Sequence, residues 1–277
     1  MISLTIGESL TDIVTRTGHE PTEHPGGSPM NVAVCLGRLG HDSHLLSDIG
    51  SDARGRAIAA HLQSSRVSLT PGSVTQRRPT SSATALVDDT GAATYDFDVS
   101  WDPDPTGIPQ NPDVIHVGSI GVTLEPGAET VSTIVAEMMG KALVSYDPNV
   151  RPSLMCSPEQ ALPRIEHAIA HSDIVKASDE DIAWLYNDAD PDDVMHRWLG
   201  MGPGLVVVTR GAHGATGLTH THRVSVGPEP VKVKDTVGAG DTFSAGILDA
   251  CSALGLAGPQ GREGLGELSE NLSLIHI

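Results

Sequence analysis

Basic residues are scarce in this chain, and their scarcity excludes two classes of partner. Only 17 of the 277 residues are lysine or arginine, against 35 aspartates and glutamates, which gives a net charge of −18. Nucleic acids and anionic lipid surfaces are bound by clustered cations that neutralise phosphates. We therefore expect neither a nucleic acid nor a membrane as a partner. With only four lysines, the protein must hold any phosphorylated ligand with backbone amides, a metal ion and a few local cations.

Cysteines and long apolar runs are also rare. The three cysteines, Cys35, Cys156 and Cys251, are far apart and lack metal-ligand spacing, which indicates a reducing cytoplasm. No stretch approaches the roughly 20 apolar residues of a membrane span, and the first residues lack the basic start of a signal peptide. Hydrophobic residues make up 39% of the chain. The composition therefore predicts a cytoplasmic globular protein with a sizeable core.

Short apolar segments alternate with helical patterns along most of the chain. This alternation predicts an α/β fold with a mostly parallel central sheet and helices on both faces. We expect a single domain over residues 1–271. The expected strands are 2–6, 44–49, 114–117, 143–146, 174–176 and 205–209, and the expected helices are 29–39, 52–62, 127–140, 158–171, 179–200 (broken near 188–191) and 243–254.

Two segments depart from this alternation. Residues 83–100 contain two strand-like runs around a turn at Gly91, and residues 10–25 have the pattern of a second hairpin that turns at Gly18. These pieces are too few to form a domain of their own. We expect them to form a small β-flap attached to the larger body.

A glycine-rich turn before an apolar helix is the segment most informative about chemistry. In the sequence Gly238-Ala239-Gly240-Asp241, the two glycines permit a tight turn that exposes successive N–H groups at the helix start, a site that favours an anion. A carboxylate beside that anion is unfavourable unless it is used. Asp241 is therefore expected to accept a proton from an attacking hydroxyl, as the general base does in phosphoryl transfer. The alternative is that Asp241 only caps the helix.

These residues also carry a family resemblance. Residues 235–243 resemble the second signature of the ribokinase-like carbohydrate kinases, the PfkB family, and residues 26–33 resemble the first signature. Both occur in the family's order at opposite ends of the chain, and the resemblance covers about residues 1–256. It implies a ribokinase-like fold in which the expected β-flap is a lid over a sugar.

The resemblance implies roles for individual residues. Asp241 corresponds to the catalytic base, and the amides of Gly238, Ala239 and Gly240 correspond to the anion hole. The residues implied to bind the sugar are Asp12, Gly26, Gly27 and Asn31. A carboxylate and an amide suit sugar hydroxyls because both accept hydrogen bonds and the amide also donates them. Taken singly, Asp12 fits a solvated loop acid and Asn31 a turn residue near a helix start.

A third motif follows the expected strand at 143–146. Residues 145–152 resemble the Asp-Pro-Asn-x-Arg motif of fructokinase-like members. Asn149 and Arg151 are therefore expected to reach the substrate or a phosphate, since ligands bind at the carboxyl ends of strands in α/β sheets. The alternative is a proline-flanked turn with a surface arginine.

Two further turns resemble regions of the family near the nucleotide. Lys176 and Asp181 correspond to a region that arranges metal-bound water near the phosphates, although residues 178–181 also fit a helix N-terminus. Thr209, Gly211 and Gly214 correspond to the turn next to the nucleotide, and an ordinary tight turn between strands fits them equally well. We expect Lys176, Thr209, Gly211 and Gly214 to bind nucleotide, and Asp181 to hold the metal through water.

The expected reaction is transfer of the γ-phosphate of ATP to a sugar hydroxyl, with Mg²⁺ offsetting the charge of ATP. The first signature lacks a lysine, which favours a neutral sugar such as fructose. Arg77 and Arg78 leave open a sugar acid such as 2-keto-3-deoxygluconate, or a sugar phosphate. From some family members, the resemblance also implies a monovalent cation such as K⁺ and a homodimer formed through the lid.

The end of the chain supports another alternative. Residues 272–277 resemble a translated adapter sequence, and a glycine-rich stretch at 258–264 stands where the family has a further helical segment. We expect a non-native tail at 272–277 and a truncated chain, so an inactive form that only binds sugar or nucleotide is an alternative to a kinase. A nicotinamide-dependent dehydrogenase is disfavoured because no Gly-x-Gly-x-x-Gly motif follows the first strand.

Overall fold

The computed structural model describes residues 1–16, 18–87, 93–228 and 236–266. The six apolar segments expected as strands of the body lie in one nine-stranded sheet, together with three strands that were not expected, at residues 67–69, 215–218 and 223–226. Neighbouring strands are parallel except at one edge, where β14 is antiparallel to both of its neighbours. The order across the sheet is β15 (Arg223–Val226), β14 (Ala215–Leu218), β13 (Leu205–Thr209), β12 (Ile174–Ser178), β11 (Leu143–Asp147), β10 (Val114–Gly118), β1 (Ile2–Ile6), β4 (Asp42–Leu46) and β6 (Val67–Leu69). The predicted α/β class is confirmed.

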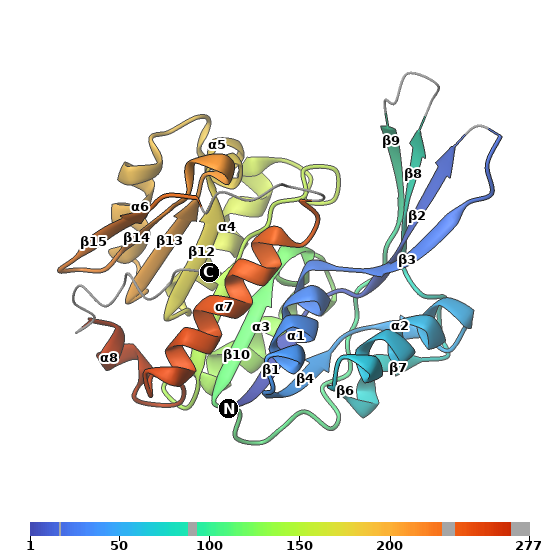
Figure 1. Ribbon diagram of the computed structural model, residues 1–277, viewed down its shortest axis with the longest axis horizontal. Coiled ribbons are helices and arrows are strands. Elements are labelled where there is room, and N and C mark those ends of the chain that lie inside the picture. The colour runs from blue at the N-terminus through green and yellow to red at the C-terminus, as the bar shows by residue number, and fades with distance from the viewer. Residues whose placement is uncertain (17, 88–92, 229–235, 267–277) are drawn as a thin grey trace.

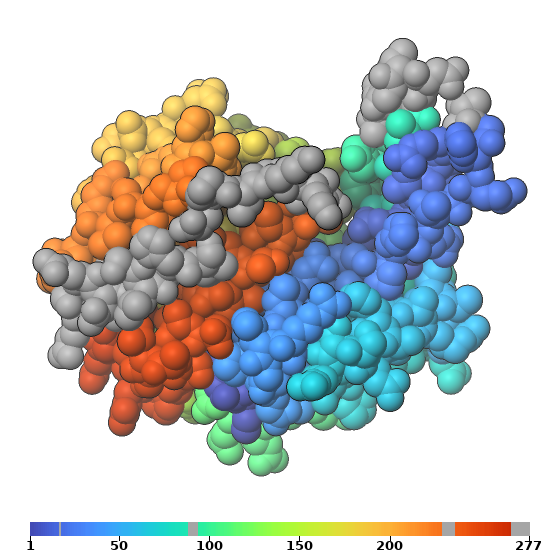
Figure 2. Space-filling view, in the orientation of Figure 1, coloured from blue at the N-terminus to red at the C-terminus, as the bar shows by residue number. Residues whose placement is uncertain are grey.

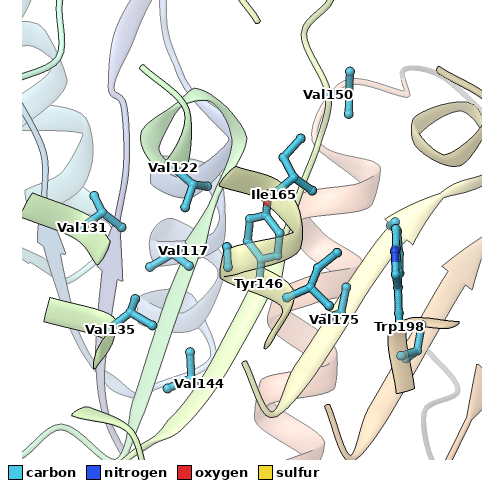
Figure 3. Packing of buried hydrophobic residues seen from close by; sticks show 14 of the residues in the cluster. Val117, Val122, Val131, Val135, Val144, Tyr146, Val150, Ile165, Val175 and Trp198 are labelled. Carbon is cyan, nitrogen blue, oxygen red and sulfur yellow. The ribbon is translucent and has the colours of Figure 1, made fainter. Parts of the chain in front are cut away.

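Helices cover both faces of this sheet, because its central strands are apolar on both sides. One face is covered by α1 (Ser28–Arg38), α2 (Ala53–Ser64) and α7 (Ala239–Ala253), and the other by α3 (Gly127–Met138), α4 (Pro158–Ala170), α5 (Asp179–Tyr186) and α6 (Pro191–Leu199). Figure 3 shows the second of these cores, where Val117 and Val144 of the sheet lie near Val131 of α3 and Ile165 of α4. The shorter elements are β5 (Ile49–Gly50), β7 (Val74–Thr75), α8 (Gly261–Gly266) and the 3₁₀ turns η1 (Pro71–Ser73), η2 (Ser119–Val122) and η3 (Gly211–His213).

Local sequence signals set several helix ends. Asp52 caps α2 by accepting a hydrogen bond from the amide of Gly55 at 2.8 Å. Ser178 and Asp181 form a capping box at the start of α5. The helical pattern at 179–200 is broken at Asn187 and Asp188, whose φ angles of 51° and 60° end α5 before α6 begins.

A second, four-stranded sheet forms the lid, which projects from one end of the body (Figures 1 and 2). Its order is β3 (Thr22–Gly26), β2 (Leu10–Arg16), β8 (Ser82–Val87) and β9 (Ala93–Asp98). Two antiparallel hairpins, β2–β3 and β8–β9, meet through the parallel pair β2–β8. Segments that are about 70 residues apart in the chain therefore build one small sheet beside the site.

Helices α1 and α7 lie side by side across the front of the sheet in Figure 1, although α1 is near the start of the chain and α7 near its end. Val32 and Leu36 of α1 share a buried cluster with Ala245 and Leu248 of α7. This packing brings the start of each helix to the same place at the carboxyl edge of the sheet.

Within the described ranges, no helix is long and apolar enough to cross a membrane. The tail expected at 272–277 and residues 267–271 of the expected domain lie outside the described residues. So does the segment 229–235, which includes Asp235 of the second signature.

Candidate active site

The glycine-rich turn begins α7 as the sequence predicts. Gly238 is the N-cap and has a φ angle of 74°, in the left-handed region that glycine adopts at little cost. A side chain at Gly240 would place its Cβ 3.0 Å from the Nζ of Lys176, so the glycine allows this ammonium group to approach the start of the helix. The amide of Ala239 donates a hydrogen bond to the carbonyl of Thr236 at 3.1 Å, so it is engaged in the turn itself. The positive end of the helix and a buried cation meet at one point, which suits an anion.

Asp241 lies in the first turn of α7, and α1 holds its carboxylate in place. Oδ1 accepts a hydrogen bond from the Ser28 hydroxyl at 2.6 Å, and Oδ2 accepts one from the Asn31 amide at 2.8 Å. Burial raises the pKa of Asp241, and these two hydrogen bonds offset the effect only in part. Gly238, not Asp241, is the N-cap of α7, so the alternative reading of Asp241 as a cap is wrong.

A cleft of about 360 Å³ lies between the lid and the carboxyl edge of the sheet. Its polar wall consists of Glu8, Asp12, Ser28, Asn31, Ser119, Asn149, Arg151 and Asp241, and its apolar wall includes Leu10, Ala83, Phe97, Ile120 and Leu154. Gly27, Gly238 and Gly240 also line the cleft. Many polar groups facing a partly apolar surface suit a small, hydroxyl-rich ligand.

Two neighbouring glycines before α1 let the lid strands and the first loop approach closely. A Cβ at Gly26 would overlap Oδ2 of Asp12, and a Cβ at Gly27 would overlap the carbonyl oxygen of Glu8. Gly27 also has a φ angle of 120°. Burial raises the pKa of Asp12, and the positive charges of Arg151 and His24 partly offset that rise. The two glycines of the first signature thus leave room for the Asp12 carboxylate and for the backbone of Glu8.

The ends of the adjacent strands β10 and β11 supply the opposite wall. Ser119 follows β10 with a φ angle of 53°, and Asn149 follows β11 with a φ angle of 37°. Both are non-glycine residues in the left-handed region, which is a strained conformation found preferentially at functional sites. Arg151 Nη1 donates a hydrogen bond to Asn149 Oδ1 at 2.8 Å, and both residues line the cleft.

Lys176 belongs to a buried ion pair below the anion site. Its Nζ lies 2.9 Å from Oδ2 of Asp147, which also accepts a hydrogen bond from the Ser244 hydroxyl at 3.1 Å. Burial opposes the charged form of Lys176, but the neighbouring carboxylates, Asp147 first, outweigh this effect and raise its pKa. The lysine therefore keeps its positive charge next to the start of α7.

Asp181 is engaged mainly by the backbone. Its Oδ1 accepts a hydrogen bond from the Val150 amide at 2.8 Å, and its Oδ2 accepts hydrogen bonds from the amide and hydroxyl of Ser178 at 2.8 and 2.7 Å. Among the described residues, no three histidine, cysteine or acidic side chains are placed to hold a metal. Mg²⁺ commonly keeps several waters and uses one or two carboxylates together with substrate phosphates. Both oxygens of Asp181 already accept hydrogen bonds and the residue is not part of the cleft lining, so its metal role stays a prediction.

The turn after β13 lies apart from the cleft lining. Thr209 donates a hydrogen bond to the carbonyl of Ala177 at 3.4 Å, and Gly211 has open space around its α-carbon. Gly214 has a φ angle of 86°, and a Cβ there would overlap the carbonyl of Val226. Packing alone therefore explains Gly214, and the nucleotide role of Thr209, Gly211 and Gly214 stays a prediction.

One family model covers most of this chain. The model of the pfkB family carbohydrate kinases matches residues 4–261. The chain belongs to this family. This kinase therefore has the ribokinase-like α/β fold that the two signatures predicted, and the predicted family is confirmed.

The relatives of this kinase include curated and solved fructokinases. The fructokinase of Rhizobium leguminosarum bv. trifolii is 36% identical over 88% of this chain and 78% of that protein, and the fructokinase of Salmonella typhimurium is 29% identical over 91% and 84%. The crystal structure of fructokinase with bound ATP from Xylella fastidiosa matches with a TM-score of 0.87 and 25% identity, covering 98% of this chain and 87% of that one.

Three residues of the cleft in this kinase, Glu8, Ser28 and Ser119, were missed as site residues. Glu8 and Ser119 follow β1 and β10 directly, the same strand-end position that identified Asn149 and Arg151. Their position directly after a strand was therefore visible in the sequence. It did not single them out, because an acid or a serine after a strand is common. Burial raises the pKa of Glu8 to about 7. The side chain of Ser28 faces Asp241 only because α1 and α7 pack together.

Proposed function

We propose that this kinase transfers the γ-phosphoryl group of ATP to a hydroxyl of a neutral sugar, with fructose as the first candidate. The observation that carries the proposal is the Asp241 carboxylate, which α1 fixes beside the glycine-rich start of α7 and which lines the cleft. The names of the relatives and the neutral-sugar chemistry of the cleft support fructose.

Asp241 acts as the general base in this mechanism. Ser28 and Asn31 each occupy one position on its carboxylate, and the remaining lone pairs are available to a hydroxyl in the cleft. The sugar hydroxyl gives its proton to Asp241 while its oxygen bonds to the γ-phosphorus. The bond between that phosphorus and the bridging oxygen breaks, and ADP leaves. The raised pKa of Asp241 brings its proton affinity closer to that of the alcohol.

The start of α7 and Lys176 hold the transferring group. Amides of Gly238 and Gly240 bind the phosphoryl oxygens, and the Lys176 ammonium stabilises the negative charge from beneath. The Ala239 amide joins them once its hydrogen bond to the Thr236 carbonyl opens. Magnesium bound with ATP would supply further charge neutralisation, and Asp181 would hold it through water. The nucleotide is bound by Lys176, Thr209, Gly211 and Gly214 in this proposal. Dependence on a monovalent cation is checked by comparing the rate of ADP release in K⁺ with the rate in Na⁺.

The charges in the cleft favour a neutral sugar over a sugar acid. Glu8, Asp12 and Asp241 all line it, whereas Arg151 is its one cationic side chain among the described residues. Arg77 and Arg78 kept a sugar acid open as an alternative. Neither is part of the cleft lining, and Arg78 is paired with Asp48 at 2.6 Å. A substrate carboxylate would meet more negative than positive charge.

Substrate choice is tested by ADP release in a coupled assay with a panel of ketoses, aldoses and sugar acids. We expect fructose or a close neutral ketose to give the highest kcat/KM, and Asp241→Asn to remove the activity. A sugar acid that is preferred over every neutral sugar contradicts the substrate assignment. No activity with any sugar, while ATP still binds, would favour the binding-only form.

The lid carries exposed apolar side chains that fit a homodimer. Tyr95 is 62% exposed and stacks on Phe97 with ring centroids 6.0 Å apart, and Leu86 is 48% exposed. A second copy packed on the lid would cover this surface and stabilise the sheet above the cleft. Light scattering after size exclusion is expected to give the mass of a dimer, and Tyr95→Asp is expected to give a monomer. A monomeric parent protein contradicts this part of the proposal.

The cytoplasm is the proposed location of the reaction. Cys35, Cys156 and Cys251 are all free thiols, which persist in a reducing compartment. Fractionation of cells that produce the protein tests this location directly.

A further inference from the structure

Two polar atoms at the floor of the cleft are buried and have no hydrogen-bond partner among the described residues. They are Oε2 of Glu8 and Oγ of Ser119. The Ser119 hydroxyl is near enough to the Glu8 carboxyl to lower its pKa in part, but neither of the two atoms makes a hydrogen bond of normal geometry. Glu8 is 6% exposed and Ser119 is fully buried, yet both line the cleft. Buried polar atoms are hydrogen-bonded in the great majority of cases, so two unpaired ones in the same cleft indicate that a ligand completes their bonding.

The fold holds these two residues in fixed positions. Glu8 follows β1 and Ser119 follows β10, and these strands are parallel neighbours in which Ile6 lies opposite Val117. Ser119 is kept in a strained left-handed conformation with a φ angle of 53°. On the other side, the backbone of Glu8 lies against Gly27, where a side chain would overlap it. The backbones that carry the two unpaired atoms are therefore held in place by their surroundings.

We propose that Glu8 and Ser119 bind one sugar hydroxyl that is not phosphorylated, and that they thereby determine which sugars this kinase accepts. This inference rests on the proposed function. The hydroxyl donates a hydrogen bond to Oε2 of Glu8, and its oxygen accepts one from the hydroxyl of Ser119. Both unpaired atoms are satisfied by one neutral group that donates and accepts at once.

The chemistry of this subsite excludes an anionic group of the ligand. Glu8 lies close enough to Asp241 for that carboxylate to raise the pKa of Glu8 further, beyond the larger effect of burial, and Arg151 is the nearby cation that lowers it in part. A carboxylate or phosphate placed against Glu8 would add a further negative charge to this buried group. Glu8 is a substrate-binding residue and not a second base, because Asp241 lies beside the anion site formed by the start of α7.

The test combines deletion of substrate hydroxyls with deletion of the protein groups. The values of kcat/KM are measured for fructose and for its 1-, 3-, 4- and 6-deoxy analogues, with the parent protein, Glu8→Ala, Glu8→Gln and Ser119→Ala. Calorimetry without ATP gives the Kd of each sugar. Tyr146→Phe is the matched control, because the Tyr146 hydroxyl is also buried and unpaired but Tyr146 packs in the core on the α3–α4 face of the sheet.

We expect the parent protein to discriminate against one deoxy analogue by about 10- to 100-fold in kcat/KM, since that analogue leaves both polar atoms unpaired. In Glu8→Ala and Ser119→Ala this factor should fall to near 1. Glu8→Gln, which keeps an acceptor oxygen, should restore part of it, and Tyr146→Phe should leave it unchanged.

Three results would overturn the inference. In the first, the parent protein treats all four analogues alike, as expected if the two atoms only hold a water molecule. In the second, the discrimination persists unchanged in both alanine variants, which assigns it to other residues. In the third, the parent protein binds no sugar by calorimetry.

The proposed function fails separately from this inference. A parent protein that binds fructose but releases no ADP contradicts the kinase proposal, whereas the pattern of Kd values across the analogues still decides the role of Glu8 and Ser119. Circular dichroism identifies any variant that does not fold, and the two alanine variants remove opposite halves of the same pair, so either one decides the question alone.

Discussion

Replacement of Asp241 by asparagine separates the proposed chemistry from the architecture that supports it. The asparagine oxygen still accepts from the Asn31 amide, and its NH₂ group donates to the Ser28 oxygen once that hydroxyl rotates, so both contacts of the carboxylate are kept. The substitution therefore removes the proton acceptor and the charge without leaving a cavity or an unpaired group.

The expected loss follows from the role of a general base. Proton transfer by a positioned side chain contributes about 10²- to 10⁴-fold to rate, so kcat for fructose should fall by that factor. The thermal stability should stay the same or rise, because burial already disfavours the ionised carboxylate, as its raised pKa shows. Asp241→Ala should instead lose about 1–3 kcal/mol of stability for each buried partner left unpaired.

The assay is ADP release at saturating ATP and sugar, with the Kd of ATP measured by calorimetry and unfolding followed by circular dichroism. Near-parental turnover in a folded Asp241→Asn protein would refute the assignment of the base. Loss of activity that occurs only together with loss of folding would also count against it.

Three further predictions follow from the geometry of the site. In Gly26→Ala the new Cβ displaces the Asp12 carboxylate. The KM for fructose should therefore rise about 3- to 10-fold, while the KM for ATP stays unchanged. Equal changes in the two KM values would contradict this prediction. Lys176→Met leaves the Asp147 carboxylate buried without its cation. The free energy of unfolding, measured in urea, should fall by about 3–5 kcal/mol, and a second substitution, Asp147→Asn, should restore much of it. A Lys176→Met protein as stable as the parent would argue against the ion pair. Burial raises the pKa of Glu8 from 4.5 to about 7 in the folded protein. Between these two pH values the folded state holds a proton that the unfolded state has lost. The free energy of unfolding therefore falls as the pH rises through this range, by about 3 kcal/mol in total. The parent protein should therefore lose that amount relative to Glu8→Gln between pH 4 and pH 8, and identical pH profiles would disprove the shift.

The sequence predicts the body of the fold well because most of its strands are short apolar runs with a helix between them. Strands β1, β10, β11, β12 and β13 lie close to their expected ranges for this reason. The antiparallel edge strands β14 and β15 were missed, because each has only four residues and little apolar contrast with the loops around it. The strand expected at 44–49 begins and ends earlier, since the polar pair Ser47-Asp48 interrupts its apolar run.

The candidate site was predictable where it depends on backbone and unpredictable where it depends on pairing between distant side chains. The left-handed turn at Gly238 follows from the local sequence alone. Asn31 was expected to face the sugar, and it does line the cleft, but its amide also binds Asp241, which requires the packing of α1 on α7. Asp147 lies inside a motif that drew attention to Asn149 and Arg151, and its ion pair with Lys176 emerges only when β11 and β12 are placed side by side.

The pairing of α1 with α7 has a consequence for how the protein is made. The residues that hold the Asp241 carboxylate precede it by 213 and 210 positions in the chain. At ribosomal rates of about 5–20 residues per second, α1 waits roughly 10–40 s before its partner helix emerges. During that time the apolar face around Val32 and Leu36 has no α7 to cover it. Chaperones or proteases can therefore bind the nascent chain during synthesis. We expect expression of the protein to depend on chaperones, because the site is built from both ends of the polypeptide.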